Sequence, residues 1–87
     1  MEEEMMLKIM TCDGIFYEGG VRMVEFPSRE GRMGVQKGHM PLTVLLDRGE
    51  IVIRERQTAR SAEGEAGFAV ITGTETVIWT RKASWLS

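Results

Sequence analysis

The sequence has few of the residues on which metal sites, disulfides and membrane-spanning helices depend. It contains one cysteine, Cys12, and one histidine, His39, in 87 residues. A single cysteine excludes an internal disulfide, and the two residues together are too few for a structural zinc site. No apolar run approaches the roughly 20 residues that a membrane-spanning helix needs. We therefore expect no disulfide, metal or spanning helix.

An excess of basic residues is also missing. The formal net charge is −2 and the isoelectric point is near 5.4, whereas a nucleic-acid-binding module usually carries excess positive charge. The acidic start of the chain, residues 1–4, is unlike a signal or transit peptide. We therefore expect no nucleic-acid partner, no direct insertion into lipid, and a chain that is cytosolic or faces the cytosol.

What the sequence does contain is typical of one small globular domain. Apolar residues make up 43% of the chain and charged residues 28%, which argues against disorder. A length of 87 residues fits one domain. We expect a frayed acidic N-terminus at residues 1–5, a single domain at 6–82 and a C-terminal tail at 83–87.

Turn signals separate short apolar runs along the whole chain. Gly19–Gly20 and Pro27–Ser28 are expected to end strands, and glycines with Pro41 make tight corners between residues 30 and 53. The near-continuous apolarity of residues 42–46 predicts a strand buried on both faces. The runs predict strands at residues 6–11, 15–18, 21–26, 32–35, 42–46, 51–54, 67–71 and 76–80.

No segment has helical periodicity over three turns, so the pattern favours an all-β fold. We expect eight to ten short strands in a flattened sandwich or barrel. Residues 55–65 lack large apolar side chains, and taken alone they read as a long loop. After Arg81 the chain is expected to trail off. Trp85 and Leu86 could either fold back on the sandwich or lie exposed at its end.

The middle of the chain carries a resemblance to a known family. Nine positions occur in order between Glu30 and Thr43, followed by Gly49 and an apolar strand: Glu30, Gly31, Gly34, Val35, Gly38, His39, Pro41, Leu42 and Thr43. This pattern resembles the N-terminal β-sandwich domain of the epsilon subunit of F-type ATP synthases. The resemblance extends over about residues 7–82.

The resemblance implies further structure. The family usually has a hairpin at the position of residues 55–65, so we expect a strand at residues 60–63, at an edge or on an exposed face because it has little to bury. Epsilon subunits continue into a C-terminal helical hairpin about where this chain stops. We therefore expect no helical hairpin in these residues, and neither ATP binding nor inhibition by the hairpin is carried over.

The resemblance also implies a function. The domain would be a non-catalytic rotor subunit in the central stalk of a proton-translocating F-type ATP synthase, peripheral on the cytoplasmic side of a bacterial membrane. It would join the gamma subunit to the c ring and couple proton-driven rotation to ATP synthesis, without a cofactor. For the c-ring interface the resemblance points to Glu30, Arg32, Gln36, Lys37, His39 and Met40. For the gamma interface it points to Leu42, Thr43 and Val44.

Two departures from the family pattern motivate an alternative. Arg32 stands where the family often has an acidic residue, and Gln36–Lys37 replaces a more typical apolar–proline pair. An arginine reverses the charge offered to a partner and would need a partner carboxylate. The alternative function is a free-standing β-sandwich adaptor for protein interactions. For His39, a ring hydrogen-bonded to the backbone of its own corner is compatible with a place in a contact surface.

Catalytic chemistry has little support in the sequence. Ser28, His39 and Asp47 could be assembled into a triad on paper, but the chain has a single histidine and no nucleophile-elbow motif. Glu63 and Glu65 could pair as acid and base, although a charged surface is the ordinary reading. We therefore expect a protein that is not an enzyme.

Overall fold

The structure, a computed structural model, describes residues 4–86 and is built from strands. The all-β prediction is confirmed, since the described residues contain no helix and hence none that could cross a bilayer. The strands are β1 (Met5–Thr11), β2 (Gly14–Val21), β3 (Met23–Ser28), β4 (Gly31–Val35), β5 (Leu42–Leu46), β6 (Gly49–Arg54), β7 (Ala59–Gly64), β8 (Gly67–Ile71), β9 (Glu75–Thr80) and β10 (Ala83–Leu86).

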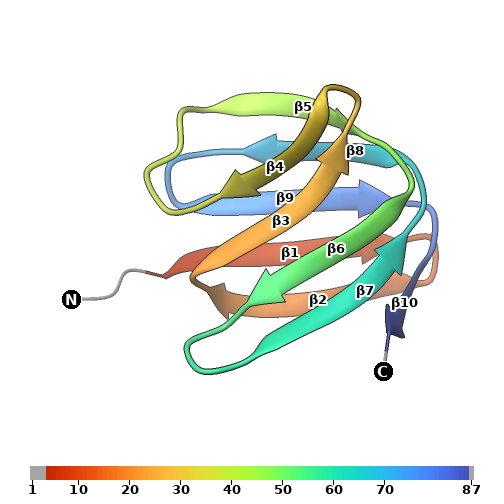
Figure 1. The fold of residues 1–87 in the computed structure, drawn as a ribbon, viewed down its shortest axis with the longest axis horizontal. Helices are drawn as coiled ribbons and strands as arrows, with labels where there is room; N and C mark the ends of the chain where they lie inside the picture. The colour runs from red at the N-terminus through yellow and green to blue at the C-terminus, as the bar shows by residue number, and fades with distance from the viewer. Residues whose placement is uncertain (1–3, 87) are drawn as a thin grey trace.

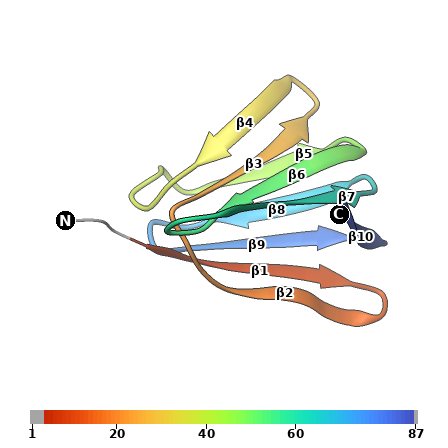
Figure 2. The same cartoon turned by 60° about the horizontal axis from the view of Figure 1, so that its bottom comes forward.

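The strands form one hydrogen-bonded path that folds into two layers. Its order is β10-β7-β6-β3-β5-β8-β9-β1-β2, with β4 on the other edge of β3. The only parallel pair in the described chain is β1 with β9. Strands β3 and β5 pair only at Ser28 and Leu46, so the path bends there. In Figure 1, β3 and β6 cross over β9 and β1, and Figure 2 shows the same strands turned by 60°.

The core lies between the two layers. In β1, Met5, Leu7 and Ile9 alternate inward and are fully buried, as the two-residue period of a strand requires. Residues from both layers complete the core: Tyr17, Val21, Val24, Phe26, Val35, Leu46, Ile51, Ile53, Ala69, Ile71 and Ile78. Met5 thus belongs to the domain and not to a frayed end, while that expectation for residues 1–3 lies outside the described residues.

Two expected strand ends are wrong. Strand β2 runs through Gly19 and Gly20 to Val21, and β3 continues through Pro27 to Ser28. Pro27 is tolerated in the strand because it takes part in pairing through its carbonyl, which accepts a hydrogen bond from the Asp47 N–H at 3.1 Å. The N–H that proline lacks is therefore not needed by a neighbour.

The strand expected at residues 60–63 is confirmed and extends over Ala59–Gly64, but the expectation of an edge strand with little to bury is wrong. Strand β7 pairs with β6 on one side and β10 on the other. Its small residues are the reason it fits. Ala62 is fully buried, and a Cβ on Gly64 would lie 2.9 Å from the Ile51 Cδ1 atom. Large apolar side chains are missing at Ala62 and Gly64 because the core has no room for them there.

The chain does not trail off after Arg81, because β10 pairs with β7 and closes one flank of the sandwich. Trp85 folds back, with its ring 4.5 Å from that of Phe16 on β2 and 3.8 Å from the Arg60 guanidinium on β7. The Tyr17 hydroxyl donates a 2.6 Å hydrogen bond to the Glu55 carboxylate. We call these five side chains the sealed flank; they tie β2 to the opposite layer.

Candidate interaction site

An apolar row crosses the outer surface of the β5-β8-β9-β1-β2 layer. The pairing registers place five side chains side by side, one from each strand: Leu45, Phe68, Trp79, Met10 and Ile15. Leu45 is 53% exposed, Trp79 44% and Ile15 55%. The Phe68 and Trp79 rings stack at 6.3 Å. We call these five residues the outer row.

Neighbouring side chains widen the outer row. Val70 and Val77 are paired on the same face, and Val70 also lies opposite Thr43 on β5. A contiguous apolar surface that no other part of the described chain covers is typical of a protein-binding face. Sequence reasoning missed this face. Its signal was present, since β8 carries apolar residues in both phases where a strand facing solvent would alternate with polar ones.

The expectation that residues 42–46 are buried on both faces is wrong. In β5 only Leu46 is buried, while Leu42 is 44% exposed. Leu45, the one apolar residue in the alternate phase of β5, faces outward with the outer row. Of the three residues predicted for the gamma interface, Thr43 lies on that outer face, and Leu42 and Val44 are in the same phase as Leu46.

Strands β4 and β5 border an open groove at the flank opposite the sealed one. We call it the mouth. The groove brings Leu42, Thr43 and Val44 together with Glu30 and Arg32, which were predicted for a different interface. Its lining residues are Ser28, Arg29, Glu30, Gly31, Arg32, Met33, Leu42, Thr43, Val44 and Leu45.

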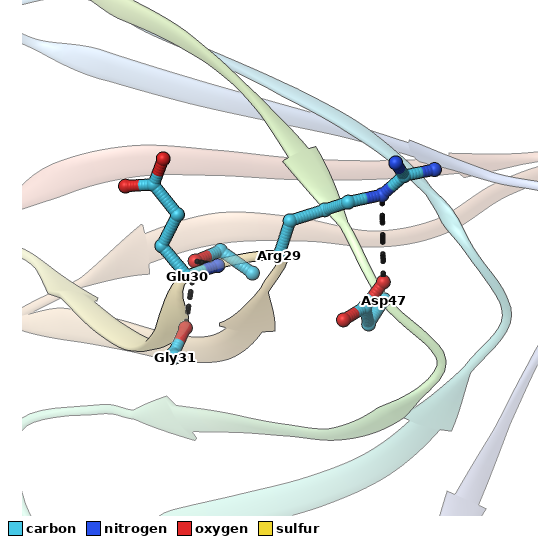
Figure 3. A network of polar contacts seen from close by, with 5 residues as sticks. Arg29, Glu30, Gly31 and Asp47 are labelled. Carbon is cyan, nitrogen blue, oxygen red and sulfur yellow. Dashed lines mark hydrogen bonds and ion pairs between the residues drawn. The ribbon is translucent and has the colours of Figure 1, made fainter.

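At the tip of the β3–β4 hairpin the backbone is held by hydrogen bonds, and the Glu30 carboxylate points outward (Figure 3). The Ser28 hydroxyl donates to the Gly31 carbonyl at 2.6 Å and accepts from the Glu30 N–H at 3.2 Å. Arg29 reaches the Asp47 carboxylate at 3.8 Å. Figure 3 shows the Glu30 carboxylate directed away from both. Since the hydroxyl of Ser28 is engaged with its own turn, the triad sketched from the sequence has no available nucleophile.

Arg32 is held against its own domain. Its Nη1 donates to the Glu50 carbonyl oxygen at 2.9 Å, reaching from β4 across to β6. The hydrogen bond from Arg54 is the main cause that holds the pKa of the Glu25 carboxyl below its ordinary value, and the positive charge of Arg32 adds to it. The positive charge that Arg32 brings to this position therefore interacts partly with groups of its own domain.

The remaining residues predicted for the c-ring interface form a second group, in the β4–β5 loop. Gln36, Lys37, His39 and Met40 lie there, and Met40 is 78% exposed. The His39 ring nitrogen Nδ1 hydrogen-bonds to the Met40 carbonyl at 2.8 Å, as expected for a corner residue. Gly38 N–H bonds to the Gly73 carbonyl, which anchors the loop to the β8–β9 turn. Residues 33–35 of β4 separate this loop from Glu30 and Arg32, so the six residues make two groups.

No constellation for bond chemistry is formed by the described residues. Glu63 pairs with Arg48 and Glu65 with Arg81, each at 3.5 Å, so these carboxylates belong to ion pairs at the surface. Residues 4–86 contain no cluster of metal-ligating side chains. The geometry supports contacts with other proteins through exposed apolar surface and ordered loops.

Comparison with known proteins assigns the chain to a family. Residues 4–86 match the family model described as ATP synthase, Delta/Epsilon chain, beta-sandwich domain. The ATP synthase epsilon chain of Campylobacter lari is 31% identical over 99% of this chain and 67% of its own length. The chloroplastic ATP synthase epsilon chain of Tetradesmus obliquus is 30% identical over 88% of this chain and 57% of its own length.

Solved structures share the fold. A chain in a cryo-EM structure of the Euglena gracilis mitochondrial ATP synthase, containing OSCP, F1 and the c-ring, matches 94% of this chain and 53% of that chain, with a TM-score of 0.89 and 21% identity. One in the central stalk and c-ring of the Tetrahymena thermophila mitochondrial ATP synthase matches with a TM-score of 0.79 and 12% identity. This chain therefore belongs to the family of ATP synthase delta/epsilon β-sandwich domains.

Proposed function

We propose that the domain is a non-catalytic part of the central stalk of a proton-translocating F-type ATP synthase, peripheral on the cytoplasmic side of a bacterial membrane. It joins the gamma subunit to the c ring, so that rotation of the ring is transmitted toward the catalytic head. Family membership supports the assignment to the synthase. The chain spans only part of its relatives, so the proposal concerns this domain.

The observation that carries the proposal is the outer row. We assign the gamma subunit to this face, with Trp79 and Phe68 as central anchors, because large aromatic side chains dominate the energetics of protein interfaces. Thr43 lies on the same face, and Leu42 and Val44 flank it at the mouth. A partner covering this surface would remove it from water, which is the main favourable term in association.

The c-ring contact is assigned to the two polar groups along β4. Glu30 and Arg32 stand at one end of that strand, and Gln36, Lys37, His39 and Met40 at the other. A strand of five residues spans about 17 Å, and a large ring can contact both ends. The loop is anchored through Gly38, so it can transmit force without first becoming ordered.

The test is co-purification with an affinity-tagged chain. The expected result is that gamma and c subunits elute with the wild-type chain, while Trp79→Asp loses the gamma subunit. The purified chain alone should hydrolyse no ATP above background. Elution without gamma and c subunits would contradict the proposal and favour a free-standing adaptor. Gln57→Asp, in the exposed β6–β7 turn, is the matched control for an added surface charge.

A further inference from the structure

At the mouth, the edges of β4 and β5 border exposed apolar side chains. Met33 and Val44 pack partly against the core, and Leu42 and Leu45 are 44% and 53% exposed at the rim. The outer row belongs to a flat face of the sheet, whereas the mouth opens into the space between the layers.

The free edge of β4 presents unpaired backbone groups. Within residues 4–86, strand β4 pairs with β3 alone. Arg32 lies opposite Pro27, which has no N–H, so this pair cannot exchange two hydrogen bonds. In an antiparallel ladder, residue pairs that exchange hydrogen bonds alternate with pairs that do not. Arg32 and Gly34 both belong to pairs that do not, so their N–H and C=O groups point away from β3. They give the edge two donors and two acceptors.

Strand β5 contributes a second edge. The Leu45 carbonyl accepts from the Arg29 N–H, on the side of β5 away from β8. Two residues earlier, the N–H and C=O groups of Thr43 point to that same side. Among the described residues, β3 reaches β5 only at Leu46, so no strand covers Thr43.

Glu30 is the carboxylate at the tip of the mouth that is left for a partner. Arg29 is paired with Asp47. Arg32 keeps its positive charge but holds it against a backbone carbonyl of β6, where it acts on Glu25. The Glu30 carboxylate has no ion pair within residues 4–86, and it is directed outward (Figure 3). A partner that matches this charge carries a lysine or arginine next to its apolar residues.

We propose that the mouth binds an extended segment of a partner protein, which adds to the edge of β4 as a further strand. One apolar side chain of the segment packs against Met33 and Val44, and a basic residue lies beside Glu30. Backbone hydrogen bonds at an open sheet edge supply affinity in this mode, and alternate side chains supply specificity. The occupant is thus an extended basic and apolar peptide.

The test uses the ¹⁵N-labelled 87-residue chain and synthetic hexapeptides that alternate valine and threonine, with a lysine at either the first or the last position. The expected result is that one peptide shifts the amide resonances of Arg32, Gly34 and Thr43 and slows their hydrogen exchange. A peptide with N-methylated backbone should not bind. Shifts confined to the outer row, no shifts at all, or dimerisation of the chain through β4 would overturn the proposal.

Charge variants give the matched control. Glu30→Lys should weaken binding of the lysine peptide by roughly threefold or more, since an exposed ion pair is replaced by repulsion. It should favour a peptide that ends in glutamate. Asp13→Lys makes the same reversal of charge in the exposed β1–β2 turn, outside the mouth, and should alter neither affinity. Equal effects of the two variants would contradict a site at Glu30. Since the assay needs no synthase subunit, its failure is distinct from failure to co-purify gamma.

Discussion

Both flanks of the sandwich bring strands of the two layers together, β2 with β10 and β4 with β5, yet they are finished differently. At the sealed flank, Phe16, Trp85 and Arg60 stack across the gap and Tyr17 bonds to Glu55. At the mouth, Leu42 and Leu45 remain exposed and backbone groups have no strand partner among the described residues.

The difference separates stability from binding. A domain of this size buries only about 60–65% of its unfolded surface, so apolar area left uncovered is a substantial loss. The sealed flank buries part of its apolar area against other residues of the chain. The mouth and the outer row leave apolar area exposed, as expected of a subunit that buries this area against partner proteins.

The largest effect should come from breaking the layer that connects the two flanks, since it runs from β5 at the mouth to β2 at the sealed flank. A Cβ on Gly67 would lie 1.9 Å from the Trp79 carbonyl oxygen, so Gly67→Ala cannot keep the β8–β9 pairing that holds β5 and β1 in one layer. We expect a loss of about 3 kcal/mol or more in the free energy of unfolding, measured by urea denaturation.

Gly73→Ala is the control for this substitution. Gly73 lies in the β8–β9 turn with open space around it, and a Cβ there meets nothing within 4 Å. Its unfolding midpoint should stay close to that of the wild type. Comparable losses from the two alanines would show that the close approach at Gly67 is not the cause.

The next effect concerns the sealed flank alone. Trp85→Ala removes the stacking on Phe16 and the contact with Arg60, and it uncovers part of β2. Since Trp85 is already 38% exposed, we expect a loss of about 2 kcal/mol, below the value for a fully buried ring. Thermal unfolding followed by circular dichroism measures it. An unchanged melting temperature would mean that the flank is not closed by these rings.

A smaller effect is expected from the polar part of the sealed flank. Tyr17→Phe removes the hydrogen bond to Glu55 and should cost about 1 kcal/mol at neutral pH. That bond lowers the pKa of the Glu55 carboxyl, so its contribution is present above the unfolded value and is lost as pH falls through the folded one. The difference between wild type and variant, followed by urea denaturation across pH, should shrink below about pH 4.

Tyr17 can be observed directly because it is the only tyrosine. Burial, and secondly the hydrogen bond to Glu55, raise its pKa to about 12. Its contribution to stability is therefore present below pH 10 and lost as pH rises through about 12. Ultraviolet titration should give a lower pKa in Glu55→Gln, still above 10 because burial remains. An ordinary pKa in the wild type would contradict the packing at this flank.

The smallest effect on stability should come from the binding surfaces. Leu45 belongs to the outer row and to the rim of the mouth, and it is 53% exposed. Leu45→Gln should change the free energy of unfolding by no more than about 0.5 kcal/mol. A loss comparable to that of Trp85→Ala would show that the outer row supports the fold, and the contrast between the surfaces would fail.

The sequence predicts the repeating parts of this fold well. The run from Gly67 to Ile71 and its β-branched partner appear as β8 and β9, and the alternation in β1 places Leu7 and Ile9 in the core. The Gly38–His39 corner also forms as predicted. These features depend on neighbours in sequence, so local patterns are sufficient to identify them.

Features that depend on distant neighbours could not be predicted. Strand β10 has four residues, and it is held in place by pairing with β7 and by the stacking of Trp85 on Phe16. The burial of Ala62 follows from how closely the layers approach. Likewise, the residues predicted for the c-ring interface are close in sequence, but Glu30 and Arg32 lie at one end of β4 and the β4–β5 loop lies at the other. The outer row required the register of five strands.

The most direct test measures gamma-subunit binding and unfolding free energy for the same two tryptophan variants. We predict that Trp79→Asp loses gamma binding and unfolds nearly as the wild type does, whereas Trp85→Ala is destabilised and, below its melting temperature, still binds gamma. If Trp79→Asp binds gamma normally, or if both variants lose binding and stability together, the separation of a sealed flank from a binding face is contradicted.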